Sequence, residues 1–164
     1  MSTAESLAAL QAATFARSPA ATTSSYPPSR RLTGEALLSV LTSPSHYAVV
    51  STTRPDGRPH SAPSAFVLSG TEIWLPTVPG AVRLRNVLAN PYAVVVVAFG
   101  VHETHVAVLA EGPVRVESSL PAAVSPLVVA KLGSVPDWAG AWIVVSPARL
   151  LSYAAEGAGL ATGD

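Results

Sequence analysis

The sequence predicts a mainly β protein, a small antiparallel barrel of six strands with short helices flanking them. Six segments have the length of a strand and are rich in β-branched or alternating apolar residues. Most connections between them carry the Gly, Pro, Asp or Asn residues of tight turns, which favours hairpins. A chain of 164 residues has the length of one domain with a sizeable core. The predicted strands are His46–Thr53, Arg58–Leu68, Thr71–Thr77, Tyr92–Phe99, Thr104–Val116 and Ala141–Ser146.

The N-terminal segment, residues 1–31, is predicted to be a helix followed by an extended arm. Apolar residues at helical spacing favour an amphipathic helix over Ser6–Phe15. Residues 17–31 are rich in Ser, Pro, Ala and Thr, which is typical of a linker without a core of its own. Thr33 is then the expected N-cap of a helix over residues 34–41.

The strand-rich middle of the chain begins with a predicted hairpin. Arg54-Pro55-Asp56-Gly57 is a strong turn sequence between the first two strands. Pro59 and Pro63 cannot donate to a ladder, so the second strand is expected at a sheet edge or with a bulge. The run Tyr92–Phe99 is apolar throughout, which predicts a strand buried on both faces. Gly112-Pro113 predicts a bulge in the strand that follows.

The last part of the chain is predicted to contain one helix before the closing strand. This helix is expected over Leu120–Leu132, with a kink at Pro126. The Gly- and Ala-rich end is expected to be frayed. The predicted organisation is therefore the N-terminal arm, a barrel domain over residues 32–155 and a flexible tail over residues 156–164.

Composition narrows the classes of function. Only 12% of the residues are charged and the formal net charge is zero, so nothing indicates nucleic-acid or membrane-surface binding. The chain has no cysteine, which excludes thiol catalysis and thiolate metal sites. No apolar run has membrane-spanning length, and no basic leader precedes one, so a cytoplasmic protein is expected. The high apolar content favours self-association.

The strongest local indication of function is the loop and helix over Thr77–Pro91. Free backbone N–H groups at a helix N-terminus attract an anion such as phosphate. Arg83 and Arg85 stand beside that point in a chain with few charges, which favours a phosphorylated ligand. At about 100° per residue, Arg83 shares a helix face with Asn86, whereas Arg85 lies apart. Arg83 is therefore the preferred phosphate anchor; the alternative is that both arginines only solvate an exposed helix.

Three segments in a fixed order resemble a known family. The sequence RPDGRPH of Arg54–His60 is followed by a strand to Phe66, then by RLRN at Arg83–Asn86, and then by Asn90-Pro91. In this order and spacing, over most of its length, the chain resembles the flavin-binding split-barrel superfamily. That superfamily contains pyridoxamine 5'-phosphate oxidase and many deazaflavin-dependent relatives.

The resemblance implies a six-stranded split barrel of the Greek-key type that forms a homodimer with two cofactor sites at its interface. It implies FMN or the deazaflavin coenzyme F-420 as the cofactor, and hydride transfer to or from a small organic substrate. The sequence leaves the choice between the two cofactors open. The positions that bind the cofactor in the family fall here on His60, Ala62, Ser64, Thr77, Arg83, Arg85 and Asn86.

The chain also departs from the family pattern. Ala81-Val82 stand where relatives carry Ser-Arg, so one phosphate contact is missing. The arginine that holds the vitamin B6 substrate is replaced by a valine in the segment that begins at Val144, and a tryptophan is replaced by Tyr153. Oxidation of vitamin B6 is therefore not expected. The missing phosphate contact leaves an alternative function open: a non-catalytic protein that binds or carries a flavin, a deazaflavin or haem.

Other motifs give less support to a function. His102-Glu103-Thr104-His105 is not the His-Glu-x-x-His motif of a zinc site, and a polar pair at a strand start is the preferred interpretation. Haem ligation by a single histidine stays an alternative. No Gly-x-Gly-x-x-Gly, Walker or Gly-x-Ser-x-Gly motif is present. The resemblance to the split-barrel superfamily therefore carries the functional prediction, and it implies an oxidoreductase in which the cofactor supplies the chemistry.

Overall fold

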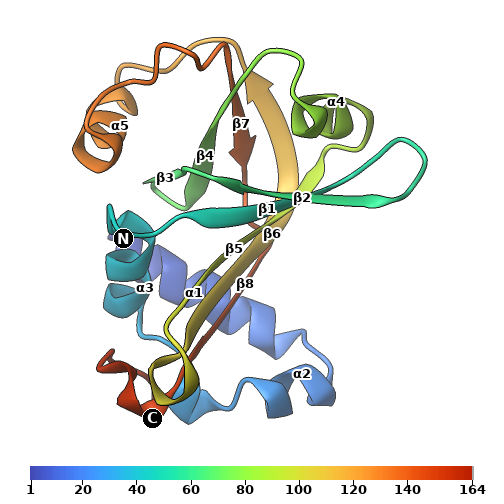
Figure 1. The fold of residues 1–164 in the computed structure, drawn as a ribbon. Coiled ribbons are helices and arrows are strands. Elements are labelled where there is room, and N and C mark those ends of the chain that lie inside the picture. The colour runs from blue at the N-terminus through green and yellow to red at the C-terminus, as the bar shows by residue number, and fades with distance from the viewer. Residues whose placement is uncertain (164) are drawn as a thin grey trace.

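The computed structural model describes residues 1–163 and shows an open, antiparallel β structure with helices at its sides and ends (Figure 1). The helices are α1 Thr3–Ala16, α2 Ala20–Ser25, α3 Gly34–Thr42, α4 Val82–Ala89 and α5 Ser125–Leu132, with short 3-10 turns η1 Pro28–Arg30, η2 His102–Thr104 and η3 Glu156–Ala158. The strands are β1 Ala48–Thr53, β2 Pro59–Ser64, β3 Val67–Ser69, β4 Glu72–Thr77, β5 Tyr92–Phe99, β6 Val106–Glu117, β7 Ala141–Val145 and β8 Arg149–Ala154.

The strands pair in the order β2-β1-β5-β6-β7-β4-β3, and β8 pairs with β6. Strand β6 is long enough to join two sheets: its first half pairs with β8, and residues 114–117 pair with β7. It bends between them at Gly112, where a Cβ atom would lie 2.1 Å from the carbonyl oxygen of Ser146. Only glycine allows this close approach, so the position predicted to be a bulge is the point where the two sheets separate.

The predicted mainly β, antiparallel fold is confirmed, but the prediction of six strands is wrong, because residues 1–163 form eight strands in a sheet that does not close. The single strand predicted over Arg58–Leu68 is two strands, since β2 pairs with β1 while β3 pairs with β4. The chain changes sheets at Ala65-Phe66. The strand β8 was not predicted, because its inward positions include a serine whose partner comes from a distant helix.

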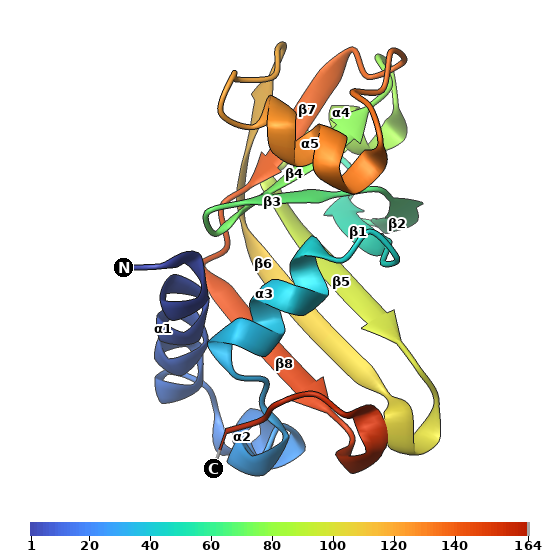
Figure 2. The same cartoon turned by 90° about the vertical axis from the view of Figure 1, so that its left-hand side faces the viewer.

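Helix α1 packs against α3 and β8 (Figure 2). Its N-terminus carries a capping box in which Ser2 and Glu5 each accept a hydrogen bond from the other's backbone N–H. Leu7 lies in the main core. Gln11 is buried, donates to the carbonyl of Leu32 at 2.9 Å and accepts from the hydroxyl of Ser152. The structure therefore ties the predicted N-terminal helix to the barrel by both apolar and polar contacts.

The segment that follows α1 lies close to the C-terminal segment of the chain. Residues 17–31, predicted to be a linker, contain α2, which buries no residue. The backbone of Thr33 donates to the carbonyl of Ala161 at 3.0 Å, and that of Gly163 donates to the carbonyl of Arg31 at 2.8 Å. Asp164, the last residue of the predicted tail, lies outside the described residues.

The helices α4 and α5 lie toward one end of the molecule, and α2 and η3 lie toward the other (Figures 1 and 2). Thr33 caps α3 as predicted, accepting from the backbone N–H of Ala36 at 3.3 Å. Helix α5 begins at Ser125 rather than Leu120, so Pro126 lies in its first turn and causes no kink. Beneath α5, Trp74 and Trp142 belong to a second, smaller core.

Candidate cofactor site

The predicted anion site is built where β4 ends and α4 begins. The connection turns at Gly80, whose φ of 78° lies in the left-handed region that glycine adopts at no steric cost. No side chain of the described chain caps the N-terminus of α4, where the N-cap position is Ala81. The backbone N–H of Leu84 donates to the carbonyl of Ala81 at 3.1 Å, so the N–H groups of Val82 and Arg83 are the first-turn donors that remain for another partner.

Arg83 lies half-buried on this helix with part of its hydrogen-bonding capacity unused. Its Nη2 atom donates to the carbonyl oxygen of Pro76 at 2.6 Å, which holds the side chain against the end of β4. Its Nε atom is buried and has no hydrogen-bond partner within residues 1–163. No carboxylate of these residues forms an ion pair with it. Burial lowers the pKa of Arg83 from its ordinary value, so a bound anion would relieve an unfavourable desolvation.

Two asparagines hold α4 against the end of β1. The Nδ2 atom of the buried Asn86 donates to the hydroxyl of Thr52 at 2.9 Å. The Nδ2 atom of Asn90 lies 3.2 Å from the carbonyl oxygen of Thr53 and 3.3 Å from that of Arg54. The helix face shared by these residues therefore fixes α4 in place and, with it, the position of Arg83.

The three predicted residues of β2 lie on the inward face of that strand. His60 pairs directly with Thr52 of β1, and residues opposite one another in an antiparallel pair project to the same face. His60 therefore lies on the sheet face to which α4 is attached. Its Nδ1 atom is buried and lacks a hydrogen-bond partner in the described chain. Ala62 is partly buried, while Ser64 is buried and donates to the carbonyl of Ala65 at 2.8 Å.

Thr77 and Arg85, the other two predicted residues, differ in burial. Thr77 is fully buried, and its hydroxyl donates to the carbonyl of Leu75 at 3.2 Å. Arg85 is exposed and lines a cavity of 330 Å³ between α4 and the β1–β2 turn, together with Arg54, Arg58 and Asn86. The separation of Arg83 from Arg85 agrees with the helix geometry predicted from the sequence.

Two further contributors to the site were not among the predicted residues. Thr52 accepts the hydrogen bond from Asn86, and the carbonyl of Pro76 accepts from Arg83. The alternation of buried and exposed positions along β1 could have placed Thr52 on the inward face. No sequence pattern indicates that the backbone carbonyl of Pro76 accepts a hydrogen bond from Arg83.

The fold and site define a class of protein: an open antiparallel barrel with an uncapped helix N-terminus and unpaired buried donors at one end. A family model described as pyridoxamine 5'-phosphate oxidase matches residues 35–151. The chain belongs to this family, which confirms the resemblance found in the sequence. It is not the vitamin B6 oxidase itself, given the departures at its C-terminal strands.

Solved structures show the same fold at low sequence identity. The conserved hypothetical protein Rv2991 from Mycobacterium tuberculosis is 18% identical, has a TM-score of 0.68, and the match covers 85% of this chain and 95% of that one. General Stress Protein 26 from Bacillus anthracis is 16% identical with a TM-score of 0.56, over 73% and 92% of the two chains. An F-420 reductase is 23% identical with a TM-score of 0.54, over 68% and 93%. No curated protein matches the chain.

Proposed function

We propose that this protein is an FMN- or coenzyme F-420-dependent oxidoreductase that binds its cofactor at the α4 end of the barrel. The observation that carries the proposal is the pair of buried, unpartnered nitrogens, Nε of Arg83 and Nδ1 of His60. Buried donors and acceptors without partners cost about 1–3 kcal/mol each, so such atoms point to a missing ligand. A structural neighbour named as an F-420 reductase supports the deazaflavin as one of the two cofactors to test.

The residues at this end of the barrel can have different roles in binding such a cofactor. Arg83 and the first-turn N–H groups of α4 would hold the phosphate, because both offer positive charge and directed donors. Asn86 and Thr52 would position Arg83 rather than touch the phosphate, since they already pair with each other. His60 and the inward face of β2 would line the space that the rest of the bound cofactor occupies. The bound cofactor would supply hydride transfer, and the protein would orient it and exclude water.

A titration of the purified protein with FMN and, separately, with F-420 tests the proposal. We expect Arg83→Ala to weaken binding of the preferred cofactor roughly 10- to 100-fold, the value of a lost charge-assisted hydrogen bond. Arg17→Ala is the matched control, because Arg17 is an exposed arginine at the C-cap of α1 whose removal changes the net charge equally. Equal affinities for the parent and Arg83→Ala would reject this anchor, and no binding of either cofactor would reject the function.

The alternative is a protein of the same fold that binds a flavin, a deazaflavin or haem without turnover. The absence of a polar side chain at Ala81-Val82 favours it, and a neighbour with a TM-score of 0.50 is named as a heme binding protein. Reoxidation of the reduced, bound cofactor by an added acceptor separates the two functions. Turnover faster than that of the free cofactor supports the enzyme, whereas tight binding without turnover supports the carrier.

The outer face of the sheet supports the proposed homodimer. The pairing register places Val49, Val96, Leu109 and Leu151 in one row across β1, β5, β6 and β8. The main core, with α1 and α3, lies on the opposite face, and Val49 is 46% exposed in the single chain. An apolar row across four strands is the kind of surface that a second copy covers.

A charge placed in this row should separate the two copies. We expect Val96→Asp to convert a dimer into a monomer in analytical ultracentrifugation, because an unpaired carboxylate would be buried at the interface. Val129→Asp, on an exposed position of α5, is the control and should leave the dimer intact. A parent protein that sediments as a monomer at all concentrations would contradict the proposed dimer.

A further inference from the structure

Lys131 is the only lysine of the chain, and it is buried. It lies in the last turn of α5, one helical turn after the buried Val128. Its Nζ atom donates to the carbonyl oxygen of Leu41, at the end of α3, at 2.8 Å. The same atom lies 3.2 Å from the centroid of the Phe66 ring. A lysine side chain is rarely buried to this degree unless it is paired with a carboxylate.

No carboxylate within residues 1–163 forms an ion pair with Lys131. Its surroundings therefore offer one carbonyl dipole and one aromatic face, which compensate a full charge only in part. Burial lowers the pKa of Lys131 from 10.5 to about 7. A sizeable fraction of the amine consequently carries a free lone pair at neutral pH, as a nucleophilic lysine requires.

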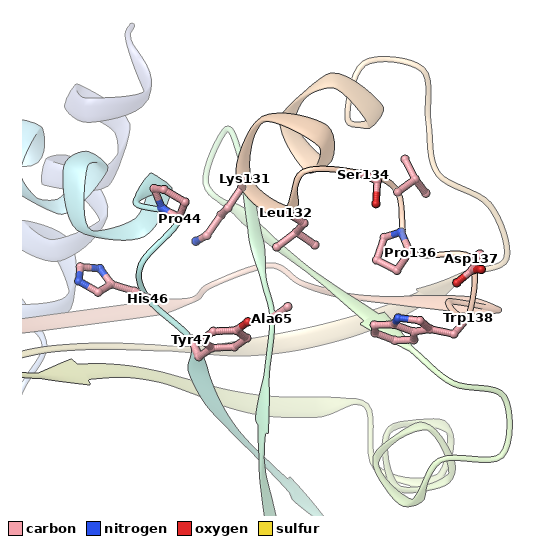
Figure 3. Close-up of a pocket in the computed structure, with 11 residues that line it drawn as sticks. Pro44, His46, Tyr47, Ala65, Lys131, Leu132, Ser134, Pro136, Asp137 and Trp138 are labelled. Atoms are coloured by element: carbon pink, nitrogen blue, oxygen red, sulfur yellow. The ribbon is translucent and has the colours of Figure 1, made fainter.

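A cavity of 670 Å³ lies beside this amine. Figure 3 shows the Lys131 side chain reaching from α5 toward the segment that carries Pro44 and His46. Tyr47 and Trp138 add two aromatic side chains to its lining, and both are largely or half exposed to solvent in the single chain. The volume is sufficient for a small organic molecule, and the aromatic side chains favour a planar one.

This cavity is distinct from the α4 end of the barrel. Ala65 follows directly after β2 and lines the cavity. In the β1–β2 ladder, Ala48 pairs with Ser64 near the cavity, whereas Thr52 pairs with His60 near α4. Four residues of a strand span about 13 Å, so the two sites lie at opposite ends of the same strand pair.

We propose that the cavity beside Lys131 binds small aromatic aldehydes and that the Lys131 amine bonds them covalently as an imine. The Nζ lone pair attacks the carbonyl carbon, and the carbonyl oxygen takes up a proton to give a carbinolamine. Nitrogen gives up one proton on forming the carbinolamine, and its lone pair then expels the protonated hydroxyl as water to form a protonated C=N bond. Loss of the last nitrogen proton from this protonated imine gives the imine. The net change is amine plus aldehyde giving imine plus water, with no oxidation or reduction. The carbonyl of Leu41, which accepts from Nζ, is placed to accept from a protonated imine.

A purely structural role is the competing interpretation. Lys131 connects α5 to α3 through the Leu41 carbonyl, and this contact alone could account for its position. In that case the amine would be shielded by burial and would react more slowly than an ordinary lysine. The two interpretations therefore predict opposite changes in reactivity on folding.

Reductive trapping distinguishes them. The protein is incubated with benzaldehyde and sodium cyanoborohydride at pH 7, and the adducts are counted by intact mass and located by peptide mapping. The chain has only two amines, Lys131 and the N-terminus, so each adduct is assigned without ambiguity. We expect Lys131 in the folded protein to be labelled at least roughly tenfold faster than in the protein unfolded in guanidinium, where its neutral fraction is far smaller. Equal or slower labelling in the folded protein overturns the proposal.

Two further measurements keep the outcome interpretable. Lys131→Arg retains the cation and should lose this adduct, while the N-terminal adduct stays unchanged as an internal reference. The pH profile of Lys131 labelling should have its midpoint near 7 rather than near 10.5. His46, Tyr47 and Asp137 also face the cavity; a midpoint that moves in His46→Gln would transfer the titration to that histidine and overturn the assignment to the amine.

Discussion

The two ends of the β1–β2 strand pair each hold a cation without a carboxylate partner in residues 1–163, half-buried Arg83 at one end and buried Lys131 at the other, and the two cations differ in their chemistry. At the α4 end, Arg83 keeps its proton at every accessible pH, so its charge can be compensated only by an anion from outside the chain. At the other end, Lys131 can compensate its burial by giving up its proton. The first arrangement suits a phosphate, and the second suits an electrophile such as an aldehyde.

The supports of the two cations differ as well. The position of Arg83 is fixed by Asn86 and Asn90, which attach α4 to β1 before any ligand binds. Arg83 itself adds a hydrogen bond to the carbonyl of Pro76, whereas Lys131 is the residue whose own amine connects α5 to the end of α3. A change at Arg83 should therefore alter binding more than folding. A change at Lys131 should alter the stability of the fold itself.

The largest expected effect is on the pH dependence of stability. Lys131 has a folded pKa of about 7 against an ordinary value of 10.5, so between these values the unfolded chain binds more protons at this amine than the folded chain. The free energy of unfolding should therefore rise as the pH rises through this window, by a few kcal/mol and at most about 5 kcal/mol. Below the folded pKa the cost of burying the charge is fully present. Urea unfolding at pH 7, 8 and 9 measures the slope.

Two variants test whether Lys131 causes this change of the unfolding free energy with pH. Lys131→Met has a similar volume and no titratable group, and should flatten the curve over this window. Arg83→Met should retain the slope of the parent, because a guanidinium does not titrate there. The groups facing the amine across the cavity, His46, Tyr47 and Asp137, are present in both variants. Parallel curves for the parent and Lys131→Met would show that the buried amine does not control stability.

The α4 end could be predicted from the sequence because its main features are local. Gly80, Arg83 and Asn86 lie within one loop and two helical turns, and helix periodicity alone separates Arg83 from Arg85. The prediction missed the carbonyl of Pro76 and the hydroxyl of Thr52, since both come from strands that meet α4 only in the folded chain. The local sequence pattern thus points to Arg83 as the candidate phosphate anchor, while tertiary contacts determine the position of its side chain.

The Lys131 cavity could not be predicted in this way. Lys131 and Leu41 are 90 residues apart in sequence, and Phe66 belongs to the point where the chain changes sheets. The same reason explains the strand count. Pro63 indicates an irregularity in this strand, but no local pattern shows that the chain changes sheets after Ser64, because β2 and β3 pair with different partners only in the folded chain. The strand β8 was missed because Ser152 is polar, and its partners when buried, the Gln11 side chain and the Leu32 backbone N–H, are distant in sequence.

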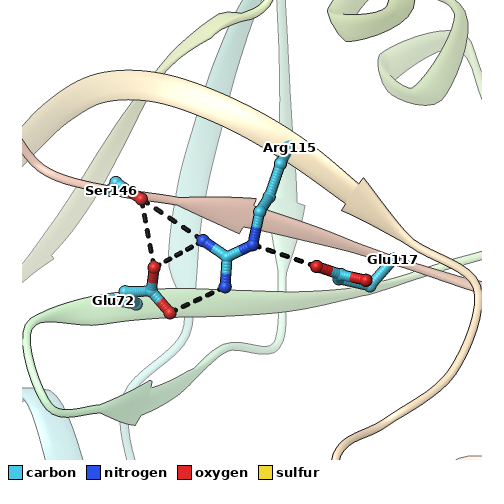
Figure 4. A network of polar contacts seen from close by, with 4 residues as sticks. All are labelled: Glu72, Arg115, Glu117 and Ser146. Carbon is cyan, nitrogen blue, oxygen red and sulfur yellow. Dashed lines mark hydrogen bonds and ion pairs between the residues drawn. The ribbon is translucent and has the colours of Figure 1, made fainter.

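Arg115 is a third cation, and it provides the opposite case to Arg83 and Lys131. Arg115 is fully paired and largely exposed: Glu72, Glu117 and Ser146 surround its guanidinium (Figure 4). Its Nη2 atom lies 2.8 Å from an oxygen of Glu72, and the side chains of Arg115 and Glu72 are 42% and 34% exposed. Hydrogen bonds from Arg115 lower the pKa of Glu72, so the pair stabilises the fold above the ordinary pKa of a glutamate, and this contribution is lost as the pH falls through the folded value.

The smallest expected effect belongs to this pair. Glu72→Gln removes the charge and keeps the shape, and at neutral pH it should lower the free energy of unfolding by less than about 1 kcal/mol, because solvent and Glu117 compensate the arginine. The loss should shrink further between about 0.05 and 0.5 M NaCl, where the Debye length falls below the size of the network. Glu117→Gln is the matched control with a similar or smaller loss. A loss of unfolding free energy above about 2 kcal/mol that persists at high salt would contradict this prediction. It would mean that an exposed ion pair affects stability as strongly as a buried cation, so the comparison of Arg83 with Lys131 could no longer be explained by burial.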